Sequence, residues 1–341
     1  MKFARPVLLA GALLATTTTA CGGAARAGSV AVAPAPAGVE VRLPDPGNSG
    51  VLAVARKDGS LERALAAVHA TVSWSAAPAA PAGFAQAAQA LDSGALDVAQ
   101  GTISTGLALL AGQPAFEFFA AAQPDPVGEG ILVKNNSGIR TVRDLIGRRV
   151  AVDPGGPGEY LLLQALAKNG VPADRVQRVR LDPAATRSAF ATGEVDAWAT
   201  TGEPVVTELA RSSAYMVVSG FGAGSDNYRL WAVRTELVRQ HPDVVRALYR
   251  YLHEAEGRAQ QDPAAYLNVF TDSGPDSVSG RAEELRVDAG RAASPVEPIR
   301  EADTVRLEKV AKLLADQGVV PAAIDVRAHL LDPAVLTGGA G

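Results

Sequence analysis

The chain has 341 residues, 48% of them hydrophobic and 20% charged, and a formal net charge of −4 at pH 7. A mildly acidic chain is a poor partner for nucleic acid, so we exclude that class of function. The single cysteine excludes a disulfide within the chain. The length is sufficient for two lobes that each have a hydrophobic core.

Residues 1–20 are predicted to be a secretory signal peptide. Lys2 and Arg5 precede a short apolar segment, and small residues lead up to Cys21. The apolar segment is too short to span a bilayer. A cysteine at this position resembles the lipidated cysteine of bacterial lipoproteins, which carries palmitate. We therefore expect a lipid anchor that holds the protein on the extracytoplasmic side of the cell membrane, and residues 21–38, rich in Ala, Gly and Pro, as a flexible tether.

The first expected strand, 39–43, ends in a candidate ligand loop. Valine and leucine alternate with polar residues along this strand, and two prolines and two glycines in 44–50 then break the pattern. Asn48 and Ser49 of the loop are candidate hydrogen-bond donors to a ligand. A helical stretch follows over 51–68.

A second candidate ligand loop lies in 150–170, which reads as a strand, a glycine-rich turn and a helix. The unpaired N–H groups of a helix N-terminus suit an anion, so we expect Gly156, Gly158 and Glu159 at a ligand site. A bulky residue at Gly158 is expected to abolish binding and leave the fold intact. The alternative is that this is only a turn. Neither G-x-G-x-x-G nor G-x-x-x-x-G-K-[ST] is present, so no nucleotide site is indicated.

A sequence pattern of the first half of the chain is repeated about a hundred residues later. Both 90–98 and 189–197 read as a helix end, a Ser-Gly or Thr-Gly stop and a strand that carries an aspartate. Two lobes built on one plan would produce this echo, although each glycine can simply cap a helix and each aspartate can bond to nearby backbone. In open α/β sheets, ligands bind beyond the carboxyl ends of strands. The candidate ligand residues after these two strands are Gly101, Thr102, Thr200, Thr201 and Glu203.

The remaining segments alternate between strands and helices. We expect the chain to cross between lobes near Pro124 and Pro126 and to return at 227–233, where Asn227 is another candidate ligand contact. Thr141 and Asp144 predict a capping box. The other expected strands are 70–75, 117–122, 128–133, 176–181 and 216–218. The other expected helices are 84–91, 183–191, 242–259, 263–270 and 301–317.

Several phrases, taken in order, resemble the substrate-binding subunits of ABC importers for aliphatic sulfonates, taurine and nitrate. They are GALDVA (94–99), GEGILV (128–133), TVRDLIG (141–147), VAV (150–152) with YLLL (160–163), VDAW (195–198), NY (227–228) and HPDVV (241–245). The resemblance implies an α/β, type II periplasmic-binding-protein fold. Each of its two lobes would have a mostly parallel sheet flanked by helices, with the ligand cleft between the lobes. We expect lobe 1 at 39–126 and 227–336 and lobe 2 at 127–226.

The resemblance also implies function and partners. Such a subunit is a monomer that captures a small solute by lobe closure and delivers it to a permease and its ATPase. The chain departs from the family at three positions. Gly156-Pro157-Gly158 replaces a hydroxyl-rich run, Glu159 replaces a neutral or basic residue, and Gly202-Glu203-Pro204 replaces Trp-Asp-Pro. An aliphatic sulfonate or a taurine-like zwitterion is favoured, and a cationic or neutral nitrogen compound stays open.

Enzymatic activity is the alternative class of function. Relatives of this fold include dehydratases and pyrimidine-synthesising enzymes, and Glu159 with Glu203 could transfer a proton if both faced one pocket. The four histidines are scattered and no zinc or nucleophile pattern occurs, so we expect no catalysis, cofactor or metal. A lipoprotein that senses a ligand or docks to another protein is the third alternative.

Overall fold

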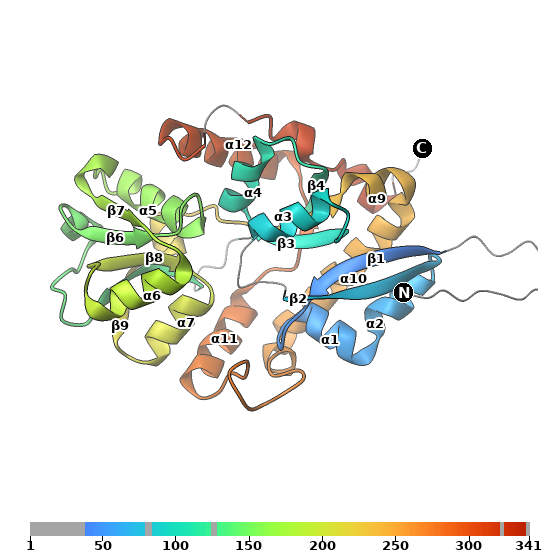
Figure 1. The fold of residues 1–341 in the computed structure, drawn as a ribbon, viewed down its shortest axis with the longest axis horizontal. Helices are drawn as coiled ribbons and strands as arrows, with labels where there is room; N and C mark the ends of the chain where they lie inside the picture. The colour runs from blue at the N-terminus through green and yellow to red at the C-terminus, as the bar shows by residue number, and fades with distance from the viewer. Residues whose placement is uncertain (1–37, 79–83, 124–127, 321–323, 339–341) are drawn as a thin grey trace, which may run out of the picture. The chain divides into compact units, whose positions relative to one another are not determined.

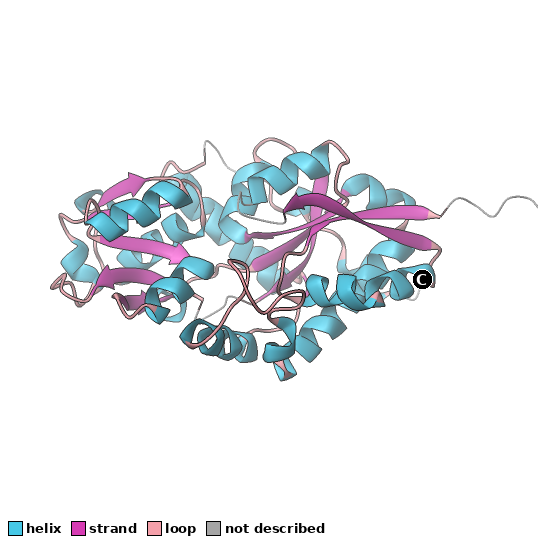
Figure 2. Cartoon of the chain, turned by 60° about the horizontal axis from the view of Figure 1, so that its bottom comes forward, coloured by secondary structure: helices cyan, strands magenta, loops and turns pink. Residues whose placement is uncertain are grey.

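The computed structural model describes residues 38–78, 84–123, 128–320 and 324–338. The expected signal peptide, the lipidation site at Cys21 and the tether up to residue 37 lie outside these residues. In Figures 1 and 2 the described strands form two separate groups, and helices flank each group.

A five-stranded sheet occupies the middle of the chain. Its order is β7-β6-β8-β5-β9. The helix α5 packs on one face, and the other face carries a smaller core that includes Phe190 and Trp198. The strands are β5 (Glu129–Lys134), β6 (Arg149–Val152), β7 (Gln177–Arg180), β8 (Ala197–Thr201) and β9 (Ala214–Ser219). The helices are α5 (Pro157–Lys168), α6 (Pro183–Thr192), α7 (Glu203–Ala210) and α8 (Gly220–Ala223).

The rest of the described chain surrounds a four-stranded sheet, ordered β11-β4-β10-β3, and the parallel pair β1-β2. The pair continues the sheet because β1 lies against β3. The strands are β1 (Val39–Asp45), β2 (Ala70–Pro78), β3 (Val98–Thr102), β4 (Phe116–Ala122), β10 (Arg229–Arg234) and β11 (Glu297–Pro298). The helices are α1 (Val51–Asp58), α2 (Ser60–Ala66), α3 (Phe84–Asp92), α4 (Ile103–Leu110), α9 (Thr235–Gln240), α10 (Pro242–Gln261), α11 (Arg281–Ala292), α12 (Glu301–Asp316) and α13 (Pro333–Thr337).

The two-lobed α/β architecture expected from the sequence is confirmed. Two crossing strands, β5 and β10, account for its antiparallel pairs apart from that of β11 with β4. β5 pairs antiparallel with β8 and β9, while β7, β6 and β8 are parallel, so four of the five strands share one direction. β10 lies antiparallel between β3 and β4, which therefore share a direction without pairing. We propose 39–126 with 227–336 and 127–226 as the bounds of the lobes, because the strands of each sheet fall within them.

The sequence echo corresponds to one arrangement that is present in both lobes. In the first, the carboxylate of Asp97 accepts hydrogen bonds from Arg42 N (2.9 Å) and Nε (2.8 Å), and Arg42 O accepts from Asp97 N. In the second, Asp196 accepts from Arg149 N (2.9 Å) and Nε (3.2 Å), and Arg149 O accepts from Asp196 N. We call each arrangement an Arg–Asp clamp. Each one ties a first strand to the start of its neighbour.

The capping box is confirmed, but one helix prediction needs correction. Thr141 and Asp144 cap a short 3-10 helix as expected. The helix expected over 263–270 is only a 3-10 turn, Pro263–Tyr266, because Asn268 adopts φ 51° and its amide pairs with the backbone of Val278. The helices that were not predicted are α4, α7, α8, α9, α11 and α13.

None of the described helices is both long and apolar enough to cross a membrane.

Candidate functional site

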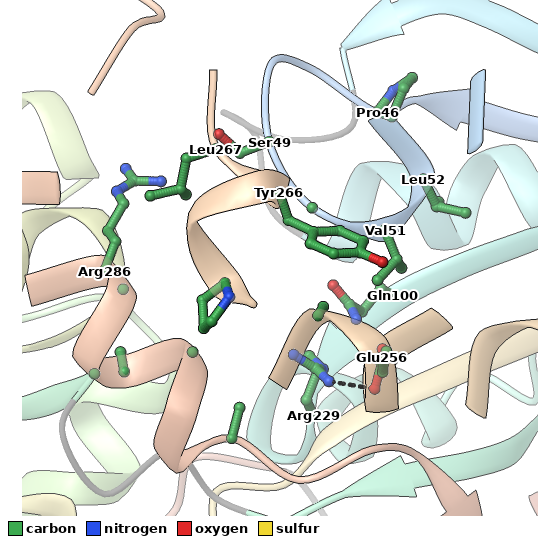
Figure 3. Close-up of a pocket in the computed structure, with 18 of the residues that line it drawn as sticks. Pro46, Ser49, Val51, Leu52, Gln100, Arg229, Glu256, Tyr266, Leu267 and Arg286 are labelled. Carbon is green, nitrogen blue, oxygen red and sulfur yellow. Dashed lines mark hydrogen bonds and ion pairs between the residues drawn. The ribbon is translucent and has the colours of Figure 1, made fainter. Parts of the chain in front are cut away.

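A pocket of about 560 Å³ lies where elements of the two lobes meet (Figure 3). Its volume is typical of sites for small molecules. Ser49 and the start of α1 line it from one lobe, together with β3, β10, α10 and α11. Gly202, Glu203 and Val206, at the start of α7, line it from the other lobe. A molecule in this pocket would contact both lobes.

The N-terminus of α1 opens into this pocket. Gly50 precedes the helix with φ 94°, a conformation that favours glycine, and its N–H bonds to Tyr266 O at 2.8 Å. No side chain caps the helix. The first N–H groups of a helix have no partner within it and carry a partial positive charge, so they attract acceptor oxygens. Val51 and Leu52, in this first turn, line the pocket.

Arg229, whose side chain is 38% exposed, forms an ion pair with the buried Glu256 in the pocket wall. Arg229 Nη2 donates to Glu256 Oε2 at 2.7 Å, and Val296 N donates to the same oxygen at 3.0 Å. Burial raises the pKa of Glu256, and the charge of Arg229 opposes that shift. Because each charge is partnered, the pair adds little net charge to the pocket.

Two of the predicted site residues, Ser49 and Glu203, line this pocket. Ser49 lines it, whereas the neighbouring Asn48 holds the 269–278 loop. Asn48 Nδ2 donates to Thr271 O at 2.8 Å, and its Oδ1 accepts from Phe270 N at 2.8 Å. Glu203 also lines the pocket, where it pairs with Arg187 at 3.1 Å. The Asn48 side chain therefore fixes a loop and is not directed at the pocket.

The glycine-rich loop before α5 is occupied by carboxylates of the chain itself. Gly155 N donates to Glu159 Oε2 at 3.0 Å, and Gly158 N donates to Asp153 Oδ1 at 3.1 Å. A Cβ on Gly158 would come within 2.2 Å of Ala199 O, and one on Gly156 within 1.4 Å of Asp153 Oδ2. The expectation that a bulky residue at Gly158 leaves the fold intact is therefore wrong, since it would meet backbone.

Glu159 is turned away from the pocket and into an ion-pair cluster. Its side chain is 1% exposed and pairs with Arg178 at 2.9 Å and with Arg180 at 2.8 Å. These arginines alternate on β7, which lies parallel to β6, so both reach the start of α5. Both oxygens of the Glu159 carboxylate therefore have partners within the chain, and a ligand role for Glu159 stays a prediction.

Asp153, beside this cluster, titrates near neutral pH. Burial raises its pKa to about 6, although hydrogen bonds from backbone N–H groups, including that of Gly158, oppose the shift. A carboxyl whose pKa is higher in the folded state than in the unfolded chain stabilises the fold when it is protonated. That contribution is complete below about pH 4 and is lost as the pH rises through about 6.

We therefore expect wild-type protein to lose about 2–3 kcal/mol of unfolding free energy, relative to Asp153→Asn, between pH 4 and pH 6.5. The amide keeps an acceptor for Gly158 N and cannot ionise. Urea unfolding of both proteins at several pH values measures the difference. A difference that does not change with pH would mean that Asp153 is ionised throughout.

The remaining predicted residues lie outside the pocket lining. Gly101 packs against the ring of Phe84, where a Cβ would approach to 2.4 Å, and Thr102 Oγ1 donates to Thr105 Oγ1 at 3.3 Å. Asn227 Nδ2 donates to Glu129 Oε2 at 3.1 Å, and this bond joins the two segments in which the chain passes from one lobe to the other. Thr200 and Thr201 pair with β5. A ligand role for these residues stays a prediction.

Most residues that line the pocket were not predicted, among them the polar side chains of Gln100, Arg229, Glu256, Tyr266 and Arg286. Gln100 and Arg229 could have been predicted from the sequence. Each is a polar residue in an apolar strand, near a residue already proposed as a ligand contact (Gly101 and Asn227). The other three lie on α10, on the turn after it and on α11, where no local pattern marks a ligand. In the described part of the chain, no cluster of three His, Cys, Asp or Glu side chains could hold a metal ion.

Comparison with known proteins gives the family. Residues 78–266, more than half of the chain, match the family described as NMT1/THI5 like. This chain belongs to the NMT1/THI5-like family. One relative of this protein, from Escherichia coli (strain K12), is named as a putative aliphatic sulfonates-binding protein. It is 27% identical over 299 residues, which cover 84% of this chain and 90% of that protein.

Solved structures confirm the fold of this NMT1/THI5-like protein. The periplasmic aliphatic sulphonate binding protein SsuA from Escherichia coli matches with a TM-score of 0.75 and 22% identity, over 88% of this chain and 93% of that one. The alkanesulfonate-binding protein SsuA from Xanthomonas axonopodis pv. citri, bound to MOPS, matches with a TM-score of 0.73 and 24% identity, over 88% of this chain and 99% of that one.

Proposed function

We propose that this protein is the extracytoplasmic solute-binding subunit of an ABC importer and that it captures a small organic anion. An aliphatic sulfonate or a taurine-like compound is favoured. The observation that carries the proposal is the pocket, which is lined by the start of α1 in one lobe and by the start of α7 in the other. The relatives named for sulfonate binding support the ligand class.

Lobe closure follows from this placement. A ligand that contacts Val51 and Leu52 on one side and Glu203 and Val206 on the other interacts with both lobes only when they are closed. Such a ligand binds the closed state more tightly and shifts the population toward it. The closed form is then the one that the permease receives.

The chemistry of the pocket suits a sulfonate with an organic chain. Arg286 and the first turn of α1 favour negative charge. Leu52 and Leu267 are among the apolar side chains that would cover the chain of the ligand.

Binding without chemistry agrees with the residues present. Among the described residues that line the pocket there is no histidine, cysteine or lysine. Its two carboxylates, Glu203 and Glu256, are both held in ion pairs. A general base needs a free acceptor within reach of the proton it removes, and neither carboxylate is placed for that role.

Thermal unfolding against a panel of ligands tests the proposal. The panel holds alkanesulfonates, taurine, nitrate, amines and pyrimidine precursors. A ligand that binds only the folded protein adds about 2.7 kcal/mol of stability at a hundred times its dissociation constant. We expect alkanesulfonates to raise the melting temperature. A shift by amines alone would overturn the ligand class, and no shift by any compound would favour a docking or sensing lipoprotein.

We also propose that the mature protein is a monomer, is anchored through a lipid on Cys21 and delivers its ligand to a permease and an ATPase. The signal-peptide pattern before Cys21 supports the anchor. Mass spectrometry of the mature N-terminus, isolated from membranes, tests it directly, since an unmodified Cys21 would refute the anchor.

A further inference from the structure

The two arginines of the pocket differ in their partners. Arg229 is neutralised by Glu256 at 2.7 Å. Arg286 has no ion pair and no side-chain hydrogen bond with any described residue. The Nε of each arginine is shielded from water without an acceptor, so the ion pair is what distinguishes them. A shielded donor without an acceptor is unusual in a folded protein. Arg286 is therefore the pocket cation whose charge is not already neutralised by the described part of the chain.

Arg286 also differs from the other two arginines of its own helix, α11. Arg281 and Arg291, the other arginines of α11, pair along the helix with Glu284 (2.7 Å) and Asp288 (3.7 Å). Both of these arginines are exposed, at 58% and 67% of the side chain. Arg286 instead faces the pocket, in the view of Figure 3 on the side where Leu267 and Ser49 lie. The acidic residues of α11 thus leave Arg286 without a partner.

The neighbourhood of Arg286 also favours an anion. Ser49, whose hydroxyl has no hydrogen-bond partner among the described residues, lines the same pocket beside the uncapped first turn of α1. A guanidinium, a hydroxyl and helix N–H groups are together suited to the three oxygens of a sulfonate. The Arg229–Glu256 pair, being neutral as a unit, suits the other end of the ligand.

We propose that Arg286 is the residue that makes this pocket selective for anionic ligands. The proposal rests on the proposed function and names the side chain that recognises the charge. Because α11 packs against α7 of the other lobe, an anion held by Arg286 also holds α11 over the closed pocket. Charge recognition and closure then depend on the same helix.

Calorimetric titration with a charged and a neutral ligand of one shape tests this. The probes are hexane-1-sulfonate and hexane-1-sulfonamide. We expect Arg286→Gln to weaken sulfonate binding at least tenfold, which is about 1.4 kcal/mol, and to leave sulfonamide binding unchanged. Arg286→Lys, which keeps the charge and loses the planar fork, should fall between the two. Arg291→Gln on the same helix is the matched control and should bind both probes as wild type does.

The outcomes separate the two proposals. If the wild-type protein binds neither probe, the sulfonate function fails. If it binds the sulfonate and Arg286→Gln binds it equally well, the function stands and Arg286 is not the selective residue. Loss of selectivity in Arg229→Gln alone would transfer that role to the ion pair and overturn the inference. Circular dichroism of each variant confirms that it is folded before it is titrated.

Discussion

Replacing Glu159 with alanine is expected to destabilise the protein by about 3 kcal/mol. The substitution removes a fully enclosed carboxylate from between Arg178 and Arg180 and frees Gly155 N from its acceptor. Removal of one partner from a buried ion pair costs about 3–5 kcal/mol when the remaining charge stays buried. The value lies at the low end here, because Arg178 and Arg180 are 21% and 48% exposed and regain water.

Urea unfolding followed by circular dichroism measures this loss, with Glu203→Ala as the control. Glu203 also begins a helix and pairs with an arginine, but both side chains are about half exposed, at 47% and 44%. Such a pair contributes at most about 1 kcal/mol. Equal midpoints for Glu159→Ala and Glu203→Ala would show that the cluster before α5 adds nothing beyond a surface pair.

The two Arg–Asp clamps are expected to differ in strength by several-fold. Asp97 is 0% exposed and also pairs with Arg234 at 2.7 Å, so Asp97→Ala should cost about 3–5 kcal/mol. Asp196 is 26% exposed and its partner Arg149 is 43% exposed, so Asp196→Ala should cost only about 1 kcal/mol. Two differences cause this: Asp97 is less accessible to solvent than Asp196, and it has Arg234 as a second arginine partner.

The same unfolding experiment on both variants measures the ratio. Each substitution is the control for the other, because each removes one carboxylate from the same pattern of strand-to-strand bonds. A larger loss in Asp196→Ala than in Asp97→Ala would contradict the argument from burial. A similar small loss in both would mean that the extra arginine at Asp97 does not stabilise it.

The sequence predicted those parts of the fold that have a local cause. The echo of 90–98 in 189–197 indicated the helix stop and the aspartate of each lobe. The clamp partners Arg42 and Arg149 were not predicted, because they lie 55 and 47 residues from those aspartates. The strand, turn and helix of 150–168 are likewise set by Pro157 at the first helical position and by glycines around it.

The site was less predictable, because its chemistry depends on contacts between distant segments. Nothing near Glu159 in the sequence shows that Arg178 and Arg180 on β7 pair with its carboxylate. The hydrogen bond of Asn48 to Thr271 was not predictable for a similar reason, since the two residues are 223 positions apart. Arg286 lies on a helix that shows no buried face, and only the tertiary structure brings that helix over the pocket.

The position of β10 between β3 and β4 also limits the order in which the strands of the two sheets can pair while the chain is synthesised from its N-terminus. The five-stranded sheet has all of its strands once Ser219 is available. β3 and β4 are made much earlier but have no direct pairing, so they must wait for Arg234, the last residue of β10. The five-stranded sheet begins later in the sequence, but it is the first that can form all of its strand pairs. Until β10 is available, the unpaired edges of β3 and β4 need protection from aggregation.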